Sequence, residues 1–207
     1  MPHPDPLTRR LHVLLVCTGN VCRSPAMEKL MSHRFGDAVE VESAGTRALV
    51  GAGMPEHTIR ALDRVGVPAG THRARQLSPE LVARADLVLA ASRPDRAAAV
   101  RLVPTASAYA FTLPEFARLA ADLGGAADPD GRDAVGPAGV VARVAARRGF
   151  VPPPAKPTED DIADPFGRPF RFHLAAVERI ARLVEGLAGA FALLEPRWPV
   201  PETGSAG

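Results

Sequence analysis

The sequence predicts an α/β fold: a single three-layer domain in which helices flank a central parallel sheet of four strands. Short apolar runs that are typical of buried strands alternate along the chain with stretches of helical spacing, as in βαβ units. The 207 residues, of which 46% are hydrophobic and 23% charged, are enough to bury one ordinary core. We therefore expect one domain over residues 10–195, between tails at 1–9 and 196–207.

The first half of the chain contains the clearer elements. The run LHVLLV at residues 11–16 predicts a buried strand, and Ser24 and Pro25 fit the N-cap and first position of a helix. Four further elements follow in order: a strand at 39–43, a helix near 55–65 that ends at Gly66, a helix from Ser78, and a strand at 86–91.

The second half is less regular. A weaker strand is expected around 107–110, and Thr112-Leu-Pro-Glu115 fits a capping box that opens a helix. Residues 121–162 are rich in Gly, Ala, Asp and Pro, with a short helical pattern at Val140, Val141 and Val144. This insertion is interpreted either as a surface decoration or as an element that gates substrate or binds a partner. A last helix is expected at 171–194, with an apolar stripe at Val177, Ile180, Val184, Leu187, Phe191 and Leu194.

The loop between the first strand and the first helix carries the chemistry. A helix N-terminus presents unpaired amides and the positive end of the macrodipole, which favour an anion such as phosphate. Cys17 begins this loop, where the same potential favours the reactive thiolate. Arg23 can grip two oxygens with its planar fork, and Gly19 and Asn20 suit unusual backbone dihedrals. The loop therefore predicts an oxyanion cradle with a nucleophile at its base.

The stretch CTGNVCRSPAMEKL resembles the phosphate-binding loop and first helix of the low-molecular-weight protein tyrosine phosphatases. Three further stretches resemble that family's landmarks in the family's order: SAGT from Ser43, HRARQL from His72 and DPFG from Asp164. The resemblance covers most of residues 10–92 and then 162–194. It implies a phosphomonoester hydrolase, specifically a protein-tyrosine phosphatase.

The resemblance also implies roles for individual residues. Cys17 would attack phosphorus and form a cysteinyl-phosphate, while Arg23 holds the transition-state oxygens. Asp164 would donate a proton to the leaving group and then act as general base for water. The phosphate-binding residues would be those of the loop: Thr18, Gly19, Asn20, Val21, Cys22, Arg23 and Ser24.

A second set of residues would support the loop from beneath. Asn20, Ser24, Ser43 and His72 match positions that form a side-chain hydrogen-bond network in the family. Cys22 matches a second loop cysteine that traps an oxidised nucleophile as a reversible disulfide. A small packed side chain is the other interpretation of Cys22, and both stay open.

The chain departs from the family at the walls of the pocket. Ala48 and Leu49 lie where the family commonly places an aromatic residue, and Gly167 follows Phe166 after Asp164-Pro165. These departures affect residues that would contact a tyrosine ring and leave the phosphate-binding loop unchanged. An arsenate reductase that uses the same cysteine with an external thiol is the alternative enzyme, and a catalytically weak phosphoprotein-binding module is the alternative outside catalysis. A P-loop nucleotide-binding protein is excluded because Gly-Lys-Ser/Thr is absent.

Composition limits the partners. A net charge of +2 from scattered arginines, with one Trp and one Tyr, argues against nucleic acid. No run approaches a membrane span, the first residues lack a signal-like apolar segment, and two closely spaced cysteines fit a reducing cytoplasm. We expect a cytoplasmic enzyme without cofactor or metal, acting on a phosphorylated protein or a small aryl phosphate. The sequence gives no expectation for oligomeric state.

Overall fold

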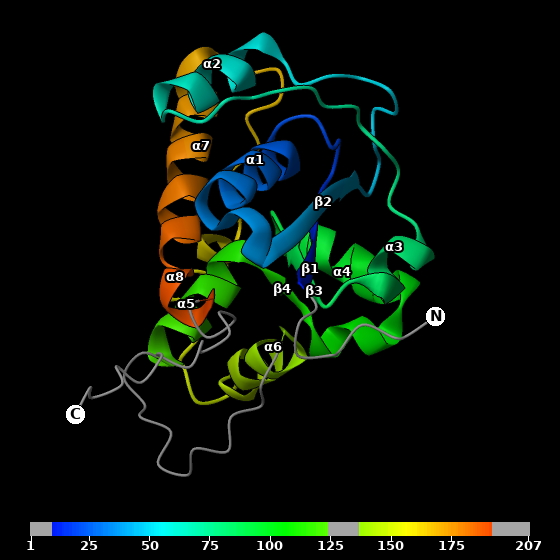
Figure 1. Cartoon of the computed structure of the whole chain (residues 1–207), viewed down its shortest axis with the longest axis vertical. Coiled ribbons are helices and arrows are strands. Elements are labelled where there is room, and N and C mark those ends of the chain that lie inside the picture. Colours follow the sequence, from blue (N-terminus) through cyan, green and yellow to red (C-terminus); the bar gives the residue numbers. More distant parts are fainter. Residues whose placement is uncertain (1–9, 124–136, 192–207) are drawn as a thin grey trace, which may run out of the picture.

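The computed structural model describes residues 10–123 and 137–191, which form a parallel sheet with helices on both faces (Figure 1). Its four strands have the order β2-β1-β3-β4, and every pairing is parallel. They are β1 (Leu11–Cys17), β2 (Val39–Gly45), β3 (Leu87–Ala90) and β4 (Ala110–Thr112). The predicted three-layer α/β fold with four parallel strands is confirmed.

The described helices are α1 (Arg23–Phe35), α2 (Glu56–Arg64), α3 (Pro79–Arg84), α4 (Arg93–Leu102), α5 (Leu113–Leu123), α6 (Pro137–Ala146), α7 (Phe170–Glu185) and α8 (Ala188–Phe191). Short 3₁₀ helices lie at Gly36–Ala38, Pro104–Ala108 and Pro157–Asp160. Local signals explain several of these ends. The Ser78 hydroxyl accepts a hydrogen bond from the amide of Leu81 and caps α3. Thr112 and Glu115 form the predicted capping box, with reciprocal hydrogen bonds of 3.2 and 3.1 Å.

Alternate residues of β1 face opposite layers. Leu11, Val13 and Leu15 pack into one core cluster together with buried residues of α1, α2, α5 and α7. Leu14 and Val16 pack into a second cluster with residues of α3 and α4. The helices of the two clusters lie on opposite sides of the sheet in Figure 1. Because β1 is buried on both faces, it reads as a continuous apolar run rather than an alternating one.

The sheet fixes where the loop after β1 lies. β1 is a central strand, and its last residue, Cys17, is in register with Gly45 at the end of β2. A Cβ atom on Gly45 would lie 2.7 Å from the Thr18 carbonyl oxygen, 2.9 Å from Asn20 Cβ and 3.0 Å from Ala48 Cα. The end of β2 therefore passes so close to the loop that only glycine fits at this position.

Some predicted elements need correction. β4 is Ala110–Thr112, whereas the strand was expected at 107–110; Pro104 instead starts a 3₁₀ helix that runs through Ala108. Helix α4 was not predicted. The last helix was expected at 171–194 but ends at Glu185, before the separate helix α8. Its predicted stripe is buried from Val177 to Phe191, while Leu194 lies outside the described residues.

Part of the predicted insertion belongs to the core. Val140, Val141 and Val144 of α6 are all buried, and the latter two join the larger core cluster. Of the predicted tails, 1–9 and 196–207 both lie outside the described residues. Within 10–123 and 137–191, none of the helices combines the length and apolar character that crossing a membrane requires.

Candidate active site

Cys17 lies at the base of the loop, and two donors point at its sulfur. The backbone N–H of Asn20 donates to Cys17 Sγ at 3.2 Å, and the Ser24 hydroxyl donates to the same sulfur at 3.0 Å. A thiolate sulfur accepts these two hydrogen bonds better than a neutral thiol does. The predicted N-cap role of Ser24 is wrong: α1 begins at Arg23 with Cys22 as N-cap and no side-chain cap. The Ser24 hydroxyl instead donates its hydrogen bond to Cys17 Sγ.

Asn20 holds the turn of the loop. Its φ of 53° is in the left-handed region, and it is the one non-glycine residue with positive φ among those described. Gly19, for which an unusual dihedral was also expected, does not have a positive φ. The buried side-chain amide of Asn20 donates through Nδ2 to Ser24 Oγ at 3.0 Å and to Ser43 Oγ at 2.9 Å. Asn20 therefore links the end of β2 to the hydroxyl that contacts Cys17.

The network continues from Asn20 to neighbouring elements. A ring nitrogen of His72, Nε2, lies 2.7 Å from the Asn20 carbonyl oxygen. The structure thus connects all four predicted support residues: Asn20, Ser24, Ser43 and His72. Sequence reasoning missed Glu28, which accepts from Ser43 Oγ at 2.6 Å, and Arg75, whose amide donates to Asn20 Oδ1 at 2.9 Å.

Arg23 is buried beside the loop, with its side chain 6% exposed. Its Nη2 donates to Asp164 Oδ2 at 2.8 Å, which brings the two residues together although 141 positions separate them. Its Nη1 donates to the Ile162 carbonyl at 3.3 Å. Its Nε is buried and has no hydrogen-bond partner. A buried donor without a partner is costly, so this Nε–H is available to a ligand.

Asp95 is a buried carboxylate beside this site that the sequence analysis did not identify. Its Oδ1 accepts hydrogen bonds from the hydroxyls of Thr18 at 3.0 Å and Thr46 at 3.3 Å. Its Oδ2 lies 3.8 Å from Arg23 Nη1. The signal that could have found it is Ser92-Arg-Pro-Asp95, which opens α4: Ser92 accepts from the Asp95 amide at 3.3 Å.

The loop forms the floor of an open pocket of about 340 Å³. Of the predicted residues, Cys17, Thr18, Gly19, Val21, Cys22, Arg23 and Asp164 line it, and they are joined by Arg47, Leu49 and Phe166. Leu49 and Phe166 are 45% and 55% exposed, so two apolar side chains stand at the mouth. Of the positions that depart from the family, Leu49 lines the pocket, whereas Ala48 and Gly167 do not.

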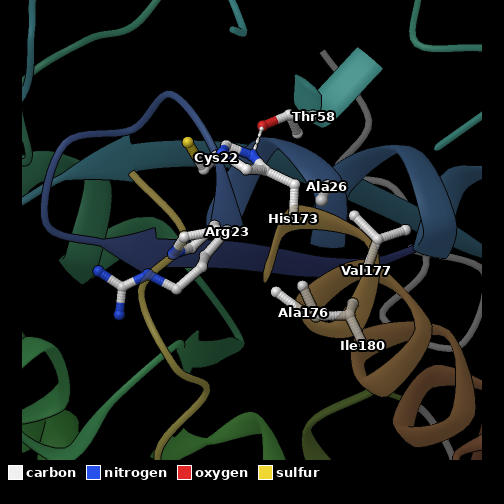
Figure 2. A pocket seen from close by; sticks show the side chains of 9 residues that line it. Cys22, Arg23, Ala26, Thr58, His173, Ala176, Val177 and Ile180 are labelled. Atoms are coloured by element: carbon white, nitrogen blue, oxygen red, sulfur yellow. Dashed lines mark hydrogen bonds between the residues drawn. The ribbon is translucent and has the colours of Figure 1, made fainter. Parts of the chain in front are cut away.

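Cys22 lies near the pocket floor and contacts a polar pair behind the loop. Thr58 Oγ1 of α2 is 2.9 Å from His173 Nδ1 of α7, as the dashed line in Figure 2 shows, while the Arg23 guanidinium points away from them. Burial raises the pKa of the Cys22 thiol to about 11, although a hydrogen bond with Thr58 lowers it in part. Burial, and then the neighbouring His57, lower the pKa of His173. Both cysteines are free thiols in the structure.

Known proteins resemble this chain in sequence and in fold. A family model described as low molecular weight phosphotyrosine protein phosphatase matches residues 12–148. The chain belongs to this family. It is 30% identical over 176 residues, 85% of this chain and 93% of the relative, to a protein-arginine-phosphatase of Geobacillus stearothermophilus. It is 31% identical to a low molecular weight protein-tyrosine-phosphatase of Acinetobacter johnsonii, over 49% of this chain and 71% of that one.

Solved structures agree with the family. The solved structure of an arginine phosphatase from G. stearothermophilus superimposes with a TM-score of 0.62 and 29% identity, covering 86% of this chain and 90% of that one. As a family member the chain is a hydrolase of the low molecular weight protein phosphatase type with a cysteine nucleophile. The relatives named here are phosphatases, so arsenate reduction is not favoured.

Proposed function

We propose that this phosphatase removes phosphate from phosphotyrosine in proteins, with Cys17 as nucleophile, Arg23 as oxyanion ligand and Asp164 as general acid and base. The observation that carries the proposal is the convergence of these three side chains on one pocket. The partnerless Nε of Arg23 and the loop at the N-terminus of α1 supply the donors for phosphate oxygens.

The chemistry follows from these positions. Cys17 Sγ attacks phosphorus as the bond to the leaving oxygen breaks, and that oxygen takes the proton of Asp164. Water then attacks the cysteinyl-phosphate, Asp164 takes a proton from the water, and Cys17 leaves as thiolate. Before substrate binds, Asp164 pairs with Arg23 at 2.8 Å. A phosphate dianion competes for that guanidinium and frees Asp164 to face the leaving oxygen.

Phosphoarginine is the second candidate substrate, because the relative from G. stearothermophilus that matches 85% of this chain is named a protein-arginine-phosphatase. The walls of the pocket favour tyrosine. Val21, Leu49 and Phe166 offer apolar surface to a ring. A phosphoarginine guanidinium needs carboxylates, and the pocket lining holds only Asp164, already paired with Arg23, while Arg47 adds a repelling cation.

Two phosphopeptides that share one sequence around phosphotyrosine or phosphoarginine separate these substrates. We expect kcat/KM to favour the phosphotyrosine peptide by at least about tenfold, the effect of about 1.4 kcal/mol in the transition state. A preference for phosphoarginine would overturn the tyrosine assignment. Thiol-dependent formation of arsenite from arsenate would instead support the reductase.

Variants test the roles of the residues. Cys17→Ser should abolish turnover yet still bind orthovanadate, because the cradle remains. Asp164→Asn should lower kcat/KM by about 100-fold or more for phenyl phosphate, whose leaving oxygen needs a proton. For 4-nitrophenyl phosphate, which has a stable leaving anion, the loss should be much smaller. Equal losses for both substrates would remove Asp164 from the role of general acid.

A further inference from the structure

The segment that leads into Asp164 is held by arginines from three helices. The contact with the most hydrogen bonds is between Asp161 and Arg93, the first residue of α4. The Arg93 amide donates to Asp161 Oδ1 at 2.7 Å. The Arg93 side chain adds Nε at 3.2 Å from both carboxylate oxygens and Nη2 at 2.8 Å from Oδ2. Asp161 is thus bound by a planar fork and by an amide at the start of a helix.

Two more arginines hold the same segment from other sides. Arg179 of α7 donates through Nη1 to the Asp161 carbonyl oxygen at 2.9 Å and through Nη2 to the Glu159 carbonyl oxygen. Arg118 of α5 donates to Asp160 Oδ2 at 3.1 Å. Arginine side chains of the surrounding helices therefore bind both the backbone and the side chains of residues 159–161.

The next residue is tied to the sheet. The Ile162 amide donates to the Ala91 carbonyl oxygen at 2.8 Å, and the Ala91 amide donates to the Val16 carbonyl oxygen at 2.7 Å. Val16 immediately precedes Cys17 on β1. Two backbone hydrogen bonds thus connect the residue before the nucleophile with a residue two positions before Asp164. Asp161 is the last side chain bound before this connection.

The charges around Asp161 keep it ionised. Burial raises the pKa of its carboxyl group, but the hydrogen bonds from the side chain and amide of Arg93 outweigh burial, so the pKa is lowered overall. The side chains of Asp161 and Arg93 are 23% and 46% exposed. An ion pair this exposed contributes little to global stability, whereas its geometry fixes the direction in which the chain continues.

We propose that Asp161 and Arg93 are positioning residues, whose ion pair sets the place of the Asp164 carboxyl group relative to the leaving oxygen. The inference rests on the proposed role of Asp164 as general acid. Neither residue of the pair lines the pocket, so we expect the pair to affect proton donation more than phosphate binding. Small displacements of a reacting group are costly: about 1 Å can cost about 100-fold in rate.

The experiment compares Asp161→Asn and Arg93→Gln with the unaltered enzyme on aryl phosphates of graded leaving-group pKa. The readout is kcat/KM, which reports transfer of phosphate to Cys17. We expect a loss of about tenfold for phenyl phosphate and of less than about twofold for 4-nitrophenyl phosphate. The inhibition constant of inorganic phosphate should stay within about twofold. Arg93→Lys, which keeps a cation beside Asp161, should lose less than Arg93→Gln.

Arg34 provides the matched control. It forms a comparable forked pair with Glu185, with distances of 2.8 and 3.3 Å, and neither residue lines the pocket. Arg34→Gln should leave the leaving-group dependence unchanged. If Asp161→Asn loses activity equally on all aryl phosphates, or loses phosphate binding in parallel, the pair is merely structural and the inference is overturned.

Asp164→Asn separates this inference from the proposed function. If Asp164→Asn shows the selective loss and Asp161→Asn does not, the positioning role is refuted while the general acid stands. If Asp164→Asn itself shows no selective loss, the proposed acid is wrong and the failure lies in the proposed function.

Discussion

Replacing Gly45 by alanine tests whether close packing between β2 and the loop holds the site in shape. The new Cβ would lie 2.7, 2.9 and 3.0 Å from three atoms, each well inside ordinary contact distance. Two of these atoms belong to the backbones of Thr18 and Ala48, so rotation of a side chain cannot relieve the clash. Overpacking of this kind costs about 1–3 kcal/mol, which lowers Tm by about 2–12 °C in a domain of this size.

The same displacement should reach the chemistry, because Thr18 and Asn20 belong to the loop that starts at Cys17. We expect kcat/KM for 4-nitrophenyl phosphate to fall by about 10- to 100-fold, with weaker inhibition by phosphate. Gly53→Ala is the matched control: its Cβ would meet only the His72 carbonyl oxygen, at 3.8 Å. If Gly45→Ala and Gly53→Ala give the same Tm and the same kcat/KM, the packing argument is refuted.

Three other predictions concern the loop and the residues behind it. With a pKa of about 11, Cys22 is a thiolate in only about one molecule in 3,000 at pH 7.5, so iodoacetamide should label Cys17 first, with loss of activity; early labelling of Cys22 by peptide mass mapping would contradict this. Because the pKa of His173 is lowered in the folded state, the unfolded chain binds a proton below about pH 6.5 that the folded chain does not. The free energy of unfolding should therefore fall as pH falls, and His173 should contribute at most about 1.4 kcal/mol per pH unit to this fall. In His173→Gln, the free energy of unfolding measured by urea titration at several pH values should depend less steeply on pH. Asn20→Ala removes three hydrogen bonds of a buried side chain and strains the left-handed backbone, so it should lose about 3 kcal/mol or more in urea unfolding, slightly more than Asn20→Gly; a loss below about 1 kcal/mol would refute the role of the network.

Elements with strong local signals could be predicted from the sequence. The run before Cys17 is apolar at nearly every position because β1 is buried on both faces, and it was placed correctly. The capping box at Thr112 was also found, because its two partners are three residues apart. In contrast, β4 has only three residues and depends on pairing with β3, so the run at 107–110 was misleading.

Side chains that act across the fold could be named only with help from the resemblance. Asp164 reaches Arg23 from 141 positions away, and nothing local distinguishes it from Asp160 or Asp161. Asp95 was missed because the start of α4, which Ser92 caps, was not predicted, and because Asp95 accepts from Thr18 across 77 positions. Ser24 was assigned a local capping role that it does not have. Ser before Pro is typical of a helix start, but the Ser24 hydroxyl donates to Cys17 Sγ.

The backbone hydrogen bond between Ile162 and Ala91 has a consequence for how sequences of different length can share this chemistry. The chain leaves the sheet at β4 and returns beside it at Ile162, and the contacts that hold the start of the Asp164 segment lie at this return. Helices α5 and α6 of the intervening stretch pack into the core, but doubling the length of a flexible loop between such elements costs only about 0.6 kcal/mol. Natural or engineered changes of length there are thus decoupled from the geometry of proton transfer, provided that the anchor at Ile162 is kept.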